Sequence, residues 1–272
     1  MPSSVRNGII WVGLSIPQGD KAGSQENQRF FWVLKGGGLP NKVSNKGELV
    51  GKVFEKLSPK WAYAIGITVI LATEFLLRDV FLPDHPSNID IGIAIIVEWL
   101  ILLALLTFWI PKVEGNRLGS IGFGGFKLRY LWMGVVTYLI LMVVWIGSSF
   151  GLKAVGLEGL QSLQPMIREY SFGVLFGLFL TGTFLEEVFY RGYLMERLIS
   201  LTGKRWLAGL ISWIAFTFVH LKFFGLGPTL DTAVLSAGLV ILYLRERSIW
   251  PCIVVHGIND VFGLLMSPLL LL

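Results

Sequence analysis

The sequence is poor in cysteine, in charged residues and in histidine. Its one cysteine, Cys252, excludes a scaffold held by disulfides and a zinc site built on cysteine ligands. Only 15% of the residues are charged. Soluble domains have about 25%, so the composition does not fit an ordinary cytosolic globular protein. Low-complexity tracts, a glycine period and heptad repeats are also missing, which excludes disordered and fibrous proteins.

Apolar residues are what the sequence has in excess. They make up 54% of the chain and give it a mean hydropathy of +0.67. Because a bilayer core about 30 Å thick takes about 20 apolar residues per helix, we predict an all-α polytopic membrane helix bundle with about seven transmembrane helices. The predicted spans are Trp61–Phe81, Ile91–Ile110, Tyr130–Phe150, Phe172–Tyr190, Trp206–Lys222, Thr229–Leu244 and Ile249–Leu270.

Lysine and arginine alternate between sparse and dense at successive crossings. The first 60 residues hold nine of them, and the loop at Pro83–Asp90 holds none. Cytoplasmic loops carry such an excess, so we predict a multi-pass cell-membrane protein with a cytoplasmic N-terminus. The predicted parts are a cytoplasmic segment 1–60, three N-terminal helices in 61–150 and a catalytic core in 172–268. The basic residues match anionic lipid headgroups, so the pI of 9.3 needs no nucleic-acid partner.

Ionisable residues inside the first two predicted spans are candidates for function, because they are costly to place in a bilayer. Glu74 and Arg78 are four residues apart on the first span, and we expect a structural pair near the interface. Glu98 on the second span has no local partner, and we expect it to contact another helix.

The fourth span carries two adjacent carboxylates, Glu186 and Glu187, after a run of almost wholly apolar residues. Adjacent residues on an α-helix point about 100° apart, so the two carboxylates cannot face one point. Glu187 is spaced to pair with Arg191, four residues later, and this would leave Glu186 free to face a cavity.

Two histidines are predicted to lie near the depth of Glu186. The fourth and fifth spans should form an antiparallel hairpin with its turn near Leu201–Lys204, and position 203 is midway between Glu186 and His220. His256 lies early in the seventh span and shares a helical face with Asp260. Such a set suits activation of water. Glu186 would be the general base, His220 would orient the water, and His256 would donate to the developing oxyanion.

Other chemistries are less well supported by the sequence. The nucleophile motifs Ser-x-x-Lys and Gly-x-Ser-x-Gly are missing, and Cys252 is a minor alternative as a nucleophile. Glu186, His220 and His256 are alternative zinc ligands with an open position for water. A metal-free mechanism without a cofactor is favoured, because the sequence has no His-Glu-x-x-His spacing.

Three motifs in this order resemble the CAAX prenyl endopeptidase type II family, a superfamily of CAAX proteases, bacteriocin-processing proteins and abortive-infection-like membrane proteins. They are Glu186-Glu187-x-x-x-Arg191, Phe216-x-x-x-His220 and His256-x-x-x-Asp260, and the resemblance covers roughly residues 172–263. It implies a helical membrane core with a cavity open to the cytoplasm. It also implies endopeptidase activity, in eukaryotic relatives on prenylated CAAX proteins.

The resemblance also implies roles for single residues. Glu186 would be the catalytic glutamate with His220 as its partner, and the other implied site residues are His256 and Asp260 at the oxyanion and the supporting Glu187, Arg191, Phe216 and Asn259. Relatives often have asparagine where this chain has Asp260. An ionised aspartate cannot donate a hydrogen bond, so Asp260 would be protonated or would orient His256 instead.

The sequence thus predicts an intramembrane endopeptidase that cleaves a lipidated or hydrophobic peptide near the cytoplasmic face. Its expected partners are membrane lipids and a peptide or lipidated protein. The alternative is a non-catalytic protein of the same fold that binds peptides, such as a bacteriocin-immunity protein. A proton-coupled transporter is disfavoured, because the outer half of the fourth span is apolar.

Overall fold

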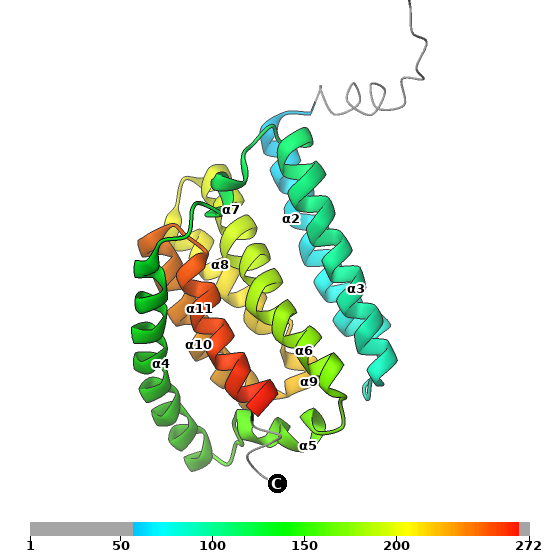
Figure 1. The fold of residues 1–272 in the computed structure, drawn as a ribbon, viewed down its shortest axis with the longest axis vertical. Helices are drawn as coiled ribbons and strands as arrows, with labels where there is room; N and C mark the ends of the chain where they lie inside the picture. Colours follow the sequence, from blue (N-terminus) through cyan, green and yellow to red (C-terminus); the bar gives the residue numbers. More distant parts are fainter. Residues whose placement is uncertain (1–56, 267–272) are drawn as a thin grey trace, which may run out of the picture. The chain divides into compact units, whose positions relative to one another are not determined.

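The computed structural model describes residues 57–266, and within that range the chain forms helices and no strand (Figure 1). The all-α prediction is therefore confirmed for the described residues. The predicted cytoplasmic segment 1–60 lies outside them, except for its last residues.

The first half of the bundle consists of a helical hairpin and one long helix. Two of these helices end in π-helical turns, and short 3₁₀ turns lie in the connections. The elements are α2 (Pro59–Phe75) with the π-helical turn Leu76–Phe81, α3 (Asn88–Ala104) with the π-helical turn Leu105–Val113, and α4 (Leu128–Ala154), with 3₁₀ turns at Leu118–Ile121 and Leu160–Leu163.

The second half begins with a continuous helix that is π-helical in its middle. Its elements are α5 (Gln164–Ile167), α6 (Phe172–Leu180), the π-helical stretch Thr181–Leu194, α7 (Met195–Thr202), α8 (Arg205–Phe218), α9 (Leu221–Phe224), α10 (Leu226–Glu246) and α11 (Trp250–Asp260) with the π-helical turn Val261–Met266. A π-helical stretch of this length is unusual, because such turns are mostly single and occur often at functional sites.

All seven predicted spans fall on apolar helices, but they differ in length. Five are long and apolar enough to cross a membrane: Pro59–Arg78, Asn88–Val113, Leu128–Ala154, Phe172–Thr202 and Leu226–Glu246. The helices Arg205–Phe218 and Trp250–Met266 are apolar but shorter. The multi-pass membrane architecture is confirmed, with two of the seven segments below the length of a full span.

Local sequence signals set several helix ends. Ser87 and Asp90 form a capping box at the start of α3, and the Ser171 hydroxyl accepts from the Val174 amide at the start of α6. Gly203 ends α7 with a φ of 70°, which glycine adopts at little cost. The predicted hairpin turn is therefore confirmed, but the fourth span runs on to Thr202 instead of ending at Tyr190.

The fifth span was predicted to reach Lys222, whereas α8 ends at Phe218. The chain turns at Val219 and His220, where the His220 amide bonds the Thr217 carbonyl. The His220 imidazole forms a hydrogen bond with the Phe216 carbonyl, and Nδ1 lies 2.7 Å from the carbonyl oxygen. A side chain that satisfies a carbonyl of the last turn is a common way for a helix to end.

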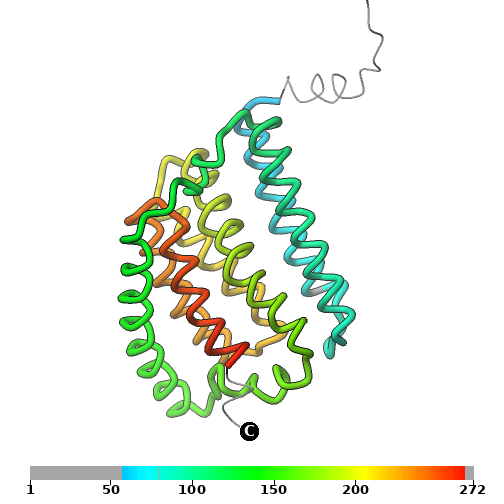
Figure 2. The backbone as a smooth tube through the Cα atoms, in the orientation of Figure 1, coloured from blue at the N-terminus to red at the C-terminus, as the bar shows by residue number. Residues whose placement is uncertain are grey.

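The bundle places α4 on one side and the α2–α3 hairpin on the other, with α6, α8, α10 and α11 between them (Figure 1). The α7–α8 and α10–α11 turns lie at one end, while α5 and the α2–α3 turn lie at the other (Figure 2). The outer helices expose large apolar side chains, such as Leu128, Trp132 and Val143 on α4. Such exposed apolar faces are expected where a protein contacts lipid.

Candidate functional site

Arg78, at the end of the α2 helix, contacts the carboxylate of Glu186. Its guanidinium donates to Glu186 Oε1 at 2.7 Å, from a residue 108 positions away in the sequence. The same guanidinium lies 3.2 Å from Glu74 Oε2 and 3.8 Å from Glu98 Oε1. The three carboxylate residues are all buried, so one cation compensates three acidic groups.

This arrangement changes three expectations from the sequence. The Glu74–Arg78 pair is present, but it is joined to the site instead of being a separate pair near the interface. The expected contact of Glu98 with another helix is confirmed by its approach to Arg78. Glu186 does line a cavity, but it is not free, because Arg78 bonds it.

Glu187 forms a second group of contacts behind the cavity. Its Oε1 accepts from Arg191 NH1 at 3.0 Å, which confirms the predicted pair, and lies 2.8 Å from His256 Nδ1. Arg191 also donates to the Ser236 hydroxyl at 2.8 Å and stacks 4.2 Å from the centre of the Phe216 ring. Glu187 and Arg191 are fully buried, and the two adjacent glutamates face different partners, as predicted.

The contacts of the two imidazoles determine which nitrogen of each ring can serve the cavity. A carbonyl oxygen only accepts, so His220 Nδ1 donates to Phe216, and Nε2 is left with a lone pair. Glu187 likewise accepts from His256 Nδ1, so His256 Nε2 is the nitrogen left for the cavity. Nε2 of His256 lies 3.6 Å from Asp260 Oδ2, on the helical face that the two residues were predicted to share.

Asp260 and its neighbours lie close to the π-helical stretch. Asn259 Nδ2 donates to Asp260 Oδ1 at 3.2 Å. A Cβ at Gly182 would lie 2.6 Å from Asp260 Oδ2 and 3.6 Å from His256 Nε2, so any larger residue here would displace the Asp260 carboxylate. The sequence analysis did not single out Gly182, and only its place one turn before Glu186 could have drawn attention to it.

A cavity of about 540 Å³ brings the predicted residues together. Glu186, His220, His256 and Asp260 line it, with Phe216, Asn259, Arg78 and Glu98. Glu187 and Arg191 do not line it and lie behind His256, as suits supporting residues. The π-helical stretch, the α8–α9 turn and α11, which carry Glu186, His220 and His256, therefore present an acid and two imidazoles to one cavity.

Residues 168–262 match the Rce1-like type II CAAX prenyl endopeptidase family. This segment holds all three motifs and confirms the resemblance seen in the sequence. Searches of curated proteins and of solved structures gave no match. The Rce1-like segment carries every predicted site residue, while Arg78 and Glu98 come from helices before it.

The zinc alternative was tested against the donor atoms of the Rce1-like site. Among residues 57–266, no group of three or more His, Cys, Asp or Glu side chains is placed to hold a metal ion. An Arg78 nitrogen lies where a cation on Glu186 Oε1 would compete. In this arrangement the residues do not fit zinc.

Cys252 is not placed to act as a nucleophile in the Rce1-like segment. It is fully buried, and its Sγ lies 3.5 Å from the Leu239 carbonyl oxygen. It is not among the residues that line the cavity. The minor alternative of a cysteine mechanism is therefore not supported by its position.

Proposed function

We propose that this protein is an intramembrane endopeptidase in which Glu186 activates a water molecule that hydrolyses a peptide bond. The observation that carries this proposal is that Glu186, His220 and His256, from three separate parts of the bundle, line one cavity. The match of residues 168–262 to an endopeptidase family supports the same class of enzyme.

The first step uses the acid and the imidazole on neighbouring helices. Glu186 accepts a proton from water as the water oxygen bonds to the carbonyl carbon of the substrate. The Nε2 lone pair of His220 orients that water, because Nδ1 is held by the Phe216 carbonyl. The carbonyl oxygen becomes an oxyanion.

The second step needs a donor for the oxyanion and a proton for the leaving group. His256, with protons on both nitrogens, donates Nδ1–H to Glu187 and Nε2–H to the oxyanion. Glu186 then passes its proton to the amine nitrogen as the carbon–nitrogen bond breaks. The products are a carboxylic acid and an amine, and the enzyme returns to its starting state.

Asp260 is assigned to orienting His256 instead of donating to the oxyanion. Its Oδ1 accepts from Asn259, and its Oδ2 lies 3.6 Å from His256 Nε2. The carboxylate on that side attracts the protonated ring without taking its Nε2–H from the oxyanion, and no donated hydrogen bond from Asp260 is needed. This assignment removes the difficulty that an ionised aspartate would bring to the oxyanion.

Arg78 is assigned as a positioning residue. Its bond to Glu186 holds the carboxylate at the cavity wall, and its charge keeps an acidic group tolerable in a buried site. It leaves the second oxygen of Glu186 for water, because the bond uses Oε1 alone.

The walls of the cavity indicate the substrate class. Away from the charged cluster they are largely apolar, with Leu163, Ile167 and Leu175 among the lining residues. Sites of this size with few polar groups bind apolar ligands. We therefore propose a hydrophobic or lipidated peptide as substrate, in a multi-pass protein of the cell membrane with lipids as its other partners.

The test is cleavage of a membrane-delivered apolar peptide by wild type and by Glu186→Gln. Loss of a general base should slow cleavage by about 10²–10⁴-fold. Glu246→Gln is the matched control, because Glu246 pairs with Arg129 away from the cavity. This variant should cleave at the wild-type rate. Equal measurable rates for wild type and Glu186→Gln would remove Glu186 as the general base. Binding of the peptide without cleavage by wild type would favour the non-catalytic peptide-binding alternative.

A further inference from the structure

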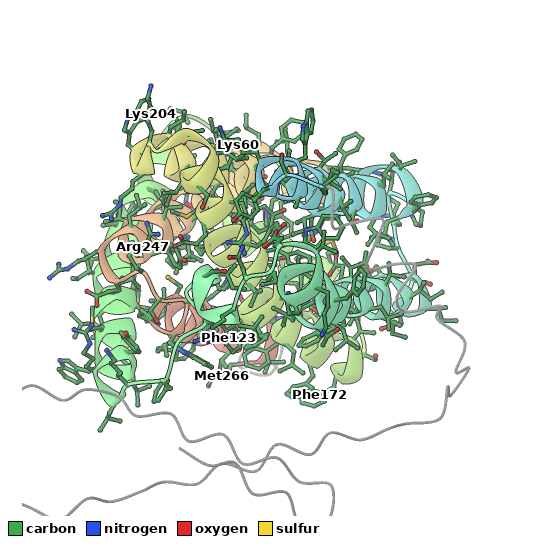
Figure 3. The ribbon with its side chains drawn as sticks, turned by 90° about the horizontal axis from the view of Figure 1, so that it is seen from above. Lys60, Phe123, Phe172, Lys204, Arg247 and Met266 are labelled. Atoms are coloured by element: carbon green, nitrogen blue, oxygen red, sulfur yellow. The ribbon has the colours of Figure 1, made fainter. Side chains whose placement is uncertain are left out.

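The two ends of the bundle differ in charge. The end with the α7–α8 and α10–α11 turns is seen from above in Figure 3, where Lys60, Lys204 and Arg247 are labelled. Its connections carry seven basic residues, Lys112, Arg117, Lys127, Lys204, Arg205, Arg245 and Arg247, against two acidic ones, Glu114 and Glu246. The other end is mixed: Asp84, Lys153, Glu158, Arg168, Glu169 and Lys222. Because cytoplasmic loops carry the excess of lysine and arginine, the basic end faces the cytoplasm.

The cavity extends to the mixed end. Its walls include Leu82 and Pro86 beside the α2–α3 turn, Phe224 of α9 and several residues of the 160–170 connection. No residue from the turns or helix ends at the basic end lines it. Gln161 lines the cavity and is exposed, so the cavity reaches the surface at the mixed end.

The basic end of the same helices is closed by packed side chains. From Leu185 onward the helix buries Val188, Phe189, Tyr193 and Leu194, each no more than 1% exposed. These side chains belong to the main apolar core, which fills the space between Glu186 and the α7–α8 turn. A substrate cannot reach Glu186 from that side without unpacking the core.

We infer that the catalytic cavity opens to the non-cytoplasmic side of the membrane and takes apolar peptide segments presented from there. That the cavity is catalytic rests on the proposed function. The side of the membrane to which it opens is inferred from the distribution of lysine and arginine. A cytoplasmic N-terminus and a cavity open to the cytoplasm would require opposite ends of this bundle to face the cytoplasm, so the two expectations cannot both hold. The predicted cleavage at the cytoplasmic face depends on the expectation of a cavity open to the cytoplasm.

The contacts around Gln161 make it a suitable reporter of the cavity mouth. Asp231 is fully buried and accepts from the Leu160 amide at 3.0 Å and from the Ser148 hydroxyl at 2.9 Å. It accepts also from the Ser149 hydroxyl at 3.3 Å. The segment that carries Gln161 is therefore anchored to α4 and α10, and a side chain there reports on one place.

Cysteine labelling can locate the mouth, because the single native Cys252 is buried and wild type serves as the unlabelled blank. Gln161→Cys and the control Lys204→Cys at the basic end are expressed in bacterial cells. Intact and lysed spheroplasts are then treated with a membrane-impermeant sulfonated maleimide. We expect Gln161→Cys to react in intact spheroplasts and Lys204→Cys to react only after lysis. Any other pattern overturns the inference, including no reaction of Gln161→Cys in intact spheroplasts.

A second measurement links the mouth to cleavage. In the purified full chain, the maleimide should slow peptide cleavage by Gln161→Cys at least severalfold and leave Lys204→Cys unchanged. Equal rates before and after labelling of Gln161→Cys would show that substrate does not pass this mouth. If neither unlabelled variant cleaves peptide, the proposed function fails, while the spheroplast pattern still decides the side.

Discussion

Two clusters of buried ion pairs lie at different levels of this bundle, and only one of them borders a cavity. Around Arg78 three carboxylates share one guanidinium beside the cavity. At the basic end, Arg197 pairs with Glu114 at 2.6 Å and stacks on the rings of Tyr63 and Tyr193.

The remaining pair of the basic-end cluster is Arg247 with Glu196, which also accepts from the Tyr243 hydroxyl at 2.6 Å. Here acids and bases are balanced one to one, and none of these four residues lines the cavity. Buried charge alone therefore does not indicate catalysis. The cluster around Arg78 differs because its acidic groups exceed their cation and converge on a cavity that two imidazoles also line, and the proposed catalysis rests on that difference.

The largest effect should come from His220. His220→Gln removes the imidazole that is proposed to orient water, so we expect cleavage to slow by about 10²–10⁴-fold. The matched control is His85→Gln in the exposed α2–α3 turn, which should cleave at the wild-type rate. Rates are compared on folded protein. A His220→Gln rate equal to that of the control would remove His220 from the mechanism.

A smaller loss is expected from Arg78. Arg78→Ala releases Glu186 from its held position, and misplacement of a reacting group can cost up to about 10²-fold in rate. Because the substrate still binds the apolar walls, kcat should fall while KM changes little. Arg78→Lys should recover part of the rate, since a single bond to Oε1 needs one donor. Loss of folding alone, with unchanged kcat in the folded fraction, would make Arg78 structural.

The opposite cluster should respond in stability. Arg197→Ala leaves the carboxylate of Glu114, whose side chain is buried, without its cation, which should lower the free energy of unfolding by about 3–5 kcal/mol. Denaturation in detergent micelles measures this change. Cleavage per folded molecule should match wild type, and a specific loss of kcat would show that the two clusters are not functionally separate.

No effect is expected from metal removal. The site residues do not fit zinc in this arrangement, so EDTA treatment followed by dialysis should leave the cleavage rate unchanged. Full loss of activity, restored by zinc, would require Glu186 to exchange Arg78 for a metal and would overturn the metal-free mechanism.

The sequence predicted the features that depend on neighbours along one helix. Apolar runs located seven helical segments, Gly203 located the hairpin turn, and i, i+4 spacing located the Glu187–Arg191 pair. The order of motifs in residues 168–262 pointed to the family that the comparison confirmed.

Contacts between distant helices were beyond that reasoning. The Arg78–Glu186 bond joins residues 108 positions apart, and His256 reaches Glu187 across 69 positions. Such pairs depend on how helices rotate and pack, which periodicity does not determine. The π-helical stretch was also missed, because the spacing was taken as 3.6 residues per turn throughout.

The most direct test of the central claim is a double-mutant cycle on Glu186 and His220. If both groups act on one water molecule, Glu186→Gln with His220→Gln should cleave no more slowly than the slower single variant, because residues that act as a unit are not additive. A double variant whose loss is the product of the two single losses would mean that the groups act independently, and it would contradict the shared water.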